Sequence, residues 1–137
     1  MPNILFFDDS LATENQIFLM ELRHAVKGTT IQVVQEKTVH HAEQKFKTVP
    51  LLIAILDVMA PWPGEQAKEA QAGLEILRRC REGAYDPKNA AIPIFMRTAR
   101  DEPHIRRLAF ELGCTNFFTV GRQDPELIAA IVAICTP

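Results

Sequence analysis

Long apolar runs are missing from this 137-residue sequence. No stretch approaches the ~20 residues that a membrane-spanning helix needs, and the first residues do not form a basic segment followed by an apolar one. The net charge is only −2, so no general attraction to nucleic acid or to an anionic membrane is expected. The sequence therefore predicts a cytoplasmic protein that binds neither nucleic acid nor membrane.

Cysteine is also scarce, with three residues that have no paired spacing: Cys80, Cys114 and Cys135. This pattern favours reduced cysteines that contribute to packing over disulfides or a metal site. The length suits one domain with a substantial core, and we see no repeat or low-complexity segment. We expect residues 1–137 to form a single domain, with no appended output module.

What the sequence does contain is a regular alternation of strand and helix signals. Short segments rich in Val, Ile, Leu and Phe predict strands at 3–7, 30–35, 51–56, 92–97 and 115–119. Helix-forming segments follow at 11–27, 38–48, 66–82 and 102–112, and a last helix opens with Asp124 as its N-cap, before Pro125 and Glu126. Five successive βα units predict a parallel sheet with helices on both faces.

Carboxylates stand where two of these strands end. Asp57 ends the most hydrophobic run of the chain, and Asp8 and Asp9 follow the first strand. The carboxyl ends of neighbouring parallel strands lie side by side and form ligand sites. Three carboxylates at one edge repel one another, and a hard cation such as Mg²⁺ relieves this. Alone, Asp8 or Asp9 would more often be a turn former or a helix cap, but together with Asp57 they favour a site.

At this point the pattern resembles the receiver domain of two-component response regulators, of the CheY type. The resemblance rests on Asp8 and Asp9 after the first strand, Asp57 after the third with Pro61 four residues on, and Thr98 and Ala99 after the fourth. It covers essentially the whole chain. It implies a flavodoxin-like, doubly wound five-stranded sheet in the order 2-1-3-4-5.

The resemblance also implies roles for individual residues. Asp57 would accept a phosphoryl group from a histidine kinase or phosphotransfer protein. Asp8, Asp9, Asp57 and the backbone carbonyl of Met59 would hold Mg²⁺. Thr98 would donate its hydroxyl to the phosphoryl group, and Phe117 would be an aromatic switch. Taken alone, Thr98 would be an ordinary strand-end residue, and Phe117 would more often be a core residue than a switch.

One departure from the family concerns the cation of the site. The family has a lysine after the fifth strand, and Val120 occupies that position here. Losing a charge-assisted contact of this kind costs on the order of 1.5–3 kcal/mol. Arg100 or Arg122 could supply the missing charge, or both could be solvated surface residues. Arg97 is next to Thr98, but strand alternation should turn the two side chains to opposite faces.

A second departure is an insertion at about 60–73, between Asp57 and the Gly73-Leu74 pair that the family reaches sooner. Helix formers at 65–72 predict that the third helix is extended at its N-terminal end. The only tryptophan, Trp62, could anchor this insertion, cover the site or contact a partner.

These observations favour a stand-alone receiver that signals by protein contact and is no enzyme beyond its own phosphorylation and autodephosphorylation. A downstream target would bind the face at 101–132, which could also form a homodimer. The alternative is a pseudo-receiver, a binding module that phosphorylation does not switch. A Mg²⁺ phosphohydrolase of the haloacid dehalogenase type is disfavoured, because the second acid that it needs two residues after the nucleophile is Met59.

Overall fold

A single parallel sheet organises the chain. The computed structural model describes residues 2–10, 12–58, 71–99 and 101–136. The five strands lie in the order β2-β1-β3-β4-β5. They are β1 (Asn3–Phe7), β2 (Gln32–Glu36), β3 (Leu51–Asp57), β4 (Ile94–Thr98) and β5 (Asn116–Thr119). The five predicted strands and their order are confirmed, with bounds that differ from the prediction by up to two residues.

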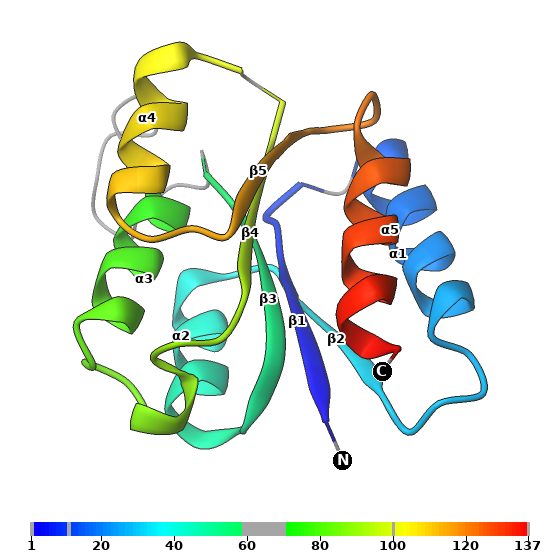
Figure 1. Ribbon diagram of the computed structural model, residues 1–137, viewed down its shortest axis with the longest axis horizontal. Coiled ribbons are helices and arrows are strands. Elements are labelled where there is room, and N and C mark those ends of the chain that lie inside the picture. The colour runs from blue at the N-terminus through cyan, green and yellow to red at the C-terminus, as the bar shows by residue number, and fades with distance from the viewer. Residues whose placement is uncertain (1, 11, 59–70, 100, 137) are drawn as a thin grey trace.

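Helices cover both faces of this sheet. They are α1 (Thr13–Ala25), α2 (Val39–Thr48), α3 (Ala72–Arg81), α4 (Pro103–Glu111) and α5 (Asp124–Cys135), with a short 3₁₀ turn η1 at Pro87–Asn89. Figure 1 shows α1 and α5 on one face and α2, α3 and α4 on the other. The predicted flavodoxin-like, doubly wound fold is confirmed. None of the helices in the described ranges is both long and apolar enough to cross a membrane.

Alternation along the strands divides the core into two clusters. Ile4 and Phe6 of β1 join α1 and α5 in one cluster, and Leu5 and Phe7 join α2, α3 and α4 in the other. Successive strand side chains point to opposite faces, so apolar residues at consecutive positions are buried on both sides. The same alternation decides on which face each residue at the strand ends lies.

The third helix begins later than the sequence predicts. Gln71 is its non-helical N-cap, with φ −134° and ψ 61°, and the helix starts at Ala72 rather than at residue 66. The good helix formers at 65–70 are only a weak local preference, and they lie outside the described residues. The role predicted for Trp62 falls outside them too.

A close approach fixes the start of this helix. A Cβ placed on Gly73 would lie 2.7 Å from the carbonyl carbon of Asp57 and 3.0 Å from the Cα of Val58. Only glycine lets the first turn of α3 come this near to the backbone. Gly73 therefore sets α3 directly against the end of β3, whatever the length of the chain between them.

The last helix also starts differently from the prediction. Gln123 is the N-cap of α5, and Asp124 is the first helical residue. The Asp124 carboxylate does not cap the helix, because both of its oxygens accept hydrogen bonds from Arg97. A buried guanidinium is a stronger partner for a carboxylate than a backbone N–H group.

Candidate functional site

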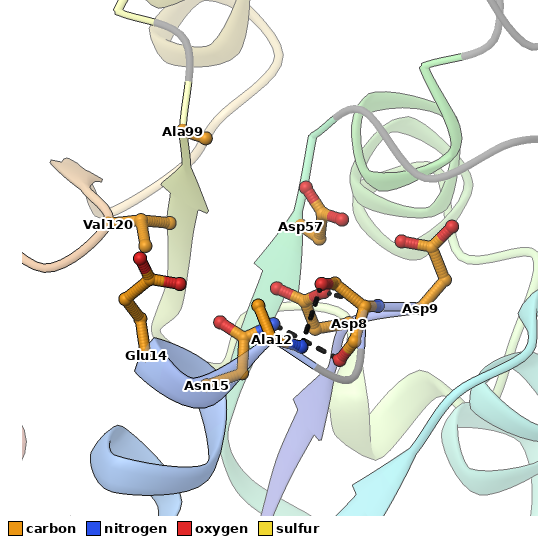
Figure 2. Close-up of a pocket in the computed structure, with 9 residues that line it drawn as sticks. Asp8, Asp9, Ala12, Glu14, Asn15, Asp57, Ala99 and Val120 are labelled. Atoms are coloured by element: carbon orange, nitrogen blue, oxygen red, sulfur yellow. Dashed lines mark hydrogen bonds between the residues drawn. The ribbon is translucent and has the colours of Figure 1, made fainter.

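Three carboxylates meet at the carboxyl ends of β1 and β3. Asp8 and Asp9 directly follow β1, and Asp57 is the last residue of β3. One carboxylate oxygen from each lies within 4.8 Å of the other two. Because β1 and β3 are neighbours in the sheet, the strand ends alone bring these side chains together. Figure 2 shows the three aspartates on one side of a pocket.

The three aspartates differ in exposure. Asp8 is 3% exposed, Asp57 is half-buried and Asp9 is exposed. Burial raises the pKa of Asp8 above its ordinary value, although the backbone N–H of Ser10 and the charge of Arg97 act in the opposite direction. The Ser10 N–H donates to Oδ1 of Asp8 over 2.8 Å. A half-buried Asp57 beside a deeply buried Asp8 leaves Asp57 the more accessible to a reactant.

The pocket around these aspartates is strongly acidic. Its described lining contains four carboxylates and neither lysine nor arginine: Asp8, Asp9, Ser10, Ala12, Glu14, Asn15, Asp57, Ala99 and Val120. Figure 2 shows Glu14 beside Val120, apart from the three aspartates. Clustered carboxylates without a cation repel one another. Oxygen ligands of this kind suit a hard divalent cation.

Arg97 was named in the sequence analysis but given no part in the site, although its side chain lies next to Asp8. Arg97 is fully buried, and its Nη1 lies 3.7 Å from Oδ2 of Asp8. Its Nε and Nη2 each donate to Asp124 over 2.9 Å, and Nη1 donates to Asn15 Oδ1 over 2.5 Å. The guanidinium lies over the Phe18 ring, 4.4 Å from its centroid. A buried arginine needs such partners, because an unpaired buried charge is very costly.

Alternation turns Arg97 and Thr98 to opposite faces, as expected, and the face of Arg97 is the one on which Asp8 lies. Arg97 is paired in register with Asp57 across β3 and β4, and register neighbours point the same way. A lone arginine directly after the apolar run from Ile94 to Met96 was the signal that could have revealed it.

The remaining predicted residues are placed as follows. Thr98 ends β4, is buried and is not among the described residues that line the pocket. Phe117 is buried in the core, with the Arg106 guanidinium 5.1 Å from its ring centroid. Arg122 is exposed and is likewise not part of that lining. Met59 and Arg100 lie outside the described residues.

Val120, which occupies the family's lysine position after the fifth strand, lines the pocket. It follows β5, its side chain is half-buried, and its backbone N–H donates to the Thr98 carbonyl over 2.8 Å. This hydrogen bond continues the pairing of β4 and β5 and holds an apolar side chain against the pocket. At this position the pocket is lined by an apolar side chain.

The chain is similar in structure to known proteins, although no protein-family model and no curated protein matches its sequence. The chemotaxis protein CheY4 of Vibrio cholerae is similar in structure, with a TM-score of 0.69, 19% identity and coverage of 98% of each chain. A response regulator from Thermotoga maritima gives a TM-score of 0.70 at 16% identity, covering 100% of this chain and 99% of its own.

A third similar structure is the receiver domain of the Francisella response regulator 1452. Its TM-score is 0.69 at 17% identity, and the match covers 98% of this chain and 96% of that domain. In all three cases the likeness extends over nearly the full length of both chains. The chain therefore has the fold of the receiver domains of response regulators.

Proposed function

We propose that this protein is a receiver domain that accepts a phosphoryl group on Asp57 and signals by protein contact. The observation that carries the proposal is the meeting of Asp8, Asp9 and Asp57 within 4.8 Å at the sheet edge. Burying or crowding three carboxylates costs free energy. Binding of a divalent cation would offset the repulsion between these carboxylates and would prepare the site for a phosphoryl group.

The residues present fit Mg²⁺. Asp8, Asp9 and Asp57 would hold the ion through carboxylate oxygens, together with the Met59 backbone carbonyl, and the described lining of the pocket holds no competing lysine or arginine. When bound, the ion would neutralise charge on the phosphoryl oxygens and orient them. The cofactor of the proposed reaction is therefore Mg²⁺.

In the proposed reaction, a carboxylate oxygen of Asp57 attacks the phosphorus atom of a phosphohistidine donor. The new O–P bond forms as the P–N bond breaks, and the imidazole leaves with the electron pair and gains a proton. Phosphoryl transfer depends mainly on positioning and charge, and a half-buried Asp57 at a pocket edge is suited to receive it. Hydrolysis of the acyl phosphate would return the carboxylate.

Thr98 and Phe117 would couple phosphorylation of Asp57 to a change in the structure around it. Thr98 ends the strand next to Asp57, and a shift of its hydroxyl toward a phosphoryl oxygen would move the following loop. Phe117 lies on the neighbouring strand β5. Its burial in the core also fits a purely structural role, so the switch is proposed from the resemblance and from this position.

A downstream target would bind the face at 101–132, which contains α4, β5 and most of α5. Leu108 and Phe110 of α4 are 37% and 44% exposed, and exposed apolar side chains favour protein contact. The same face could form a homodimer. We propose further that residues 1–137 form one cytoplasmic receiver domain, with the insertion at about 60–73, and that its phosphoryl donor is a histidine kinase or a phosphotransfer protein.

The missing lysine could be replaced by Arg100 or Arg122. Both follow site strands closely in sequence, but Arg122 is exposed in this state, so it would have to move on phosphorylation. Substituting each by alanine tests the idea. If Arg100→Ala and Arg122→Ala both leave the phosphorylation rate and the phosphate lifetime unchanged, neither is the replacement.

Val120 favours a second candidate function. The Val120 side chain in the pocket lining can form no ion pair with the acceptor carboxylate or with a phosphoryl group. The protein could therefore be a pseudo-receiver that binds partners without being switched. The three clustered aspartates favour the phosphorylated receiver. A phosphohydrolase of the haloacid dehalogenase type is disfavoured because Met59 supplies no second acid.

Intact mass after incubation with Mg²⁺ and acetyl phosphate separates these functions. The receiver gains one phosphoryl group in the wild type and none in Asp57→Asn. The small donor makes the result independent of the choice of kinase. The absence of any adduct, together with no stabilisation by trifluoroberyllate, an analogue that mimics an aspartyl phosphate, would support the pseudo-receiver. Turnover of a generic phosphate ester would instead support the hydrolase.

A further inference from the structure

Arg97 joins the pocket to two helices on the same face of the sheet. Its guanidinium contacts Asp124 in the first turn of α5 through Nε and Nη2, and Asn15 in the first turn of α1 through Nη1. The same Nη1 lies 3.7 Å from Oδ2 of Asp8. The whole side chain is buried. A rigid, fully donating guanidinium of this kind fixes the positions of the groups around it.

Asp8 is held from two sides as a result. The Ser10 N–H donates to Oδ1 over 2.8 Å, and Oδ2 faces the Arg97 guanidinium. Asn15 connects these two sides, because its Oδ1 accepts from Arg97 and its Nδ2 donates to the Ser10 carbonyl over 3.2 Å. Groups that orient a metal-binding carboxylate from behind contribute strongly to metal affinity.

The positive charge of Arg97 also lies close to an acidic pocket, because Arg97 faces Asp8 in the pocket lining. The described lining has four carboxylates and the apolar Val120. Arg97 is in register with Asp57 on the adjacent strand and faces Asp8 directly. Its positive charge therefore acts on the site through Asp8, and does not come from the Val120 position.

We propose that Arg97 is a positioning residue of the Asp8–Asp9–Asp57 site, which holds Asp8 in the orientation that binds a divalent cation. This inference rests on the proposed function. It gives Asn15 the task of orienting Arg97, and it gives Asp124 the task of anchoring it. The simpler role, in which Arg97 and Asp124 only form a buried ion pair, predicts a different result in the experiment below.

The experiment measures Mg²⁺ affinity by calorimetry, with thermal unfolding in the absence of Mg²⁺ as a check on folding. The main variant combines Arg97→Met with Asp124→Leu, because removing both members of the Arg97–Asp124 ion pair should cost less stability than removing Arg97 alone. Arg97→Lys keeps the charge but cannot make all the hydrogen bonds of a guanidinium. Arg107→Met removes an exposed arginine of α4 and serves as the control.

We expect the folded double variant to lose about tenfold or more in Mg²⁺ affinity. Arg97→Lys should lose less, and Arg107→Met should match the wild type. A folded double variant that binds Mg²⁺ as tightly as the wild type would contradict the proposal and leave only the structural ion pair. If the wild type itself binds no Mg²⁺, the proposed function fails together with this inference.

Asn15→Ala provides a second test that leaves the Arg97–Asp124 pair intact. It removes the amide that contacts Arg97 Nη1, the Ser10 carbonyl and the Asp8 carboxylate. We expect its Mg²⁺ affinity to fall by severalfold, and its unfolding temperature to fall as well because the buried Nη1 of Arg97 loses an acceptor. Unchanged affinity in Asn15→Ala would contradict the proposal even if the double variant did not fold.

Discussion

Arg97 and Asp57 are register partners on adjacent strands, and the guanidinium of Arg97 extends to Asp8, which directly follows β1. One buried cation thus connects the strands that carry two of the three site carboxylates. Its hydrogen bonds to Asp124 and Asn15 extend the connection to α5 and α1. The acidic site is therefore built on a polar network inside the core, and not only on loops at the surface.

The first prediction concerns the stability of this network. Arg97→Met alone should lower the free energy of unfolding by about 3–5 kcal/mol, because it leaves buried carboxylates of Asp8 and Asp124 without their partner. Urea unfolding measures the change. Arg107→Met, at an exposed position, should change the free energy by no more than about 0.5 kcal/mol. Equal effects of the two substitutions would show that the buried network contributes little.

The second prediction uses the close approach of α3 to β3. Gly73→Ala would place a Cβ 2.7 Å from the Asp57 carbonyl carbon. We expect it to destabilise the protein by roughly 1–3 kcal/mol and to slow phosphorylation, since the acceptor must move with its backbone. Rates of adduct formation by intact mass measure the second effect.

Gly28→Ala is the matched control for that substitution. Gly28 has φ +86° and nothing within 4 Å of an added Cβ, so alanine there is strained without touching the site. It should lower stability but leave the phosphorylation rate of the folded protein unchanged. Equal phosphorylation rates in both variants would mean that Gly73 does not position Asp57.

The third prediction concerns the apolar wall of the pocket. Val120→Lys would place an ammonium group where the described lining has no cation. A charge-assisted contact with the phosphoryl group is worth on the order of 1.5–3 kcal/mol, so phosphorylation by acetyl phosphate should accelerate by at least about tenfold. Val120→Met controls for side-chain size and should have no such effect. If the lysine variant is no faster, the site does not depend on a cation from this strand.

The fourth prediction follows from the cysteines. Burial raises the pKa of Cys114 to about 11 and also raises that of Cys80, and both side chains are buried. Near pH ~8.5, the ordinary pKa of a thiol, these two should react slowly with iodoacetamide, while the half-buried Cys135 reacts first. Because the thiolate is the nucleophile, labelling of Cys114 should keep rising toward pH 11.

Peptide mapping after timed labelling checks this order, and labelling in urea gives the unfolded reference, in which all three thiols should react alike. Labelling of Cys114 in the folded protein as fast as Cys135 would show that the segment between α4 and β5 opens readily. The three cysteines would then not be the packing residues that the sequence predicted.

The fold could be predicted from the sequence because its signals are local. The alternation of apolar strand segments with helix formers indicates the parallel sheet. The aspartates that follow the first strand and end the third indicate the edge of the sheet at which the carboxylates meet. The start of the third helix could not, because helix propensity at 65–72 does not report the non-helical backbone of Gln71. Nor could the conformation of Asp124, whose carboxylate prefers a guanidinium from a distant strand.

Arg97 was the larger omission, and its cause is physical. Alternation correctly separates Arg97 from Thr98, but it does not show on which face the site lies. That depends on the register of β3 against β4, which pairs Asp57 with Arg97, and on long-range contacts with Asn15 and Asp124. An arginine in an apolar strand demands buried partners, and these are visible only once the helices are in place.

The most direct test of the account is the position of the phosphoryl group. After treatment with acetyl phosphate and Mg²⁺, borohydride reduction converts an aspartyl phosphate to homoserine, and peptide sequencing by mass spectrometry locates it. The account predicts homoserine at position 57 in the wild type, and none in Asp57→Asn or when Mg²⁺ is chelated. Homoserine at another aspartate, or an adduct that persists in Asp57→Asn, would contradict it.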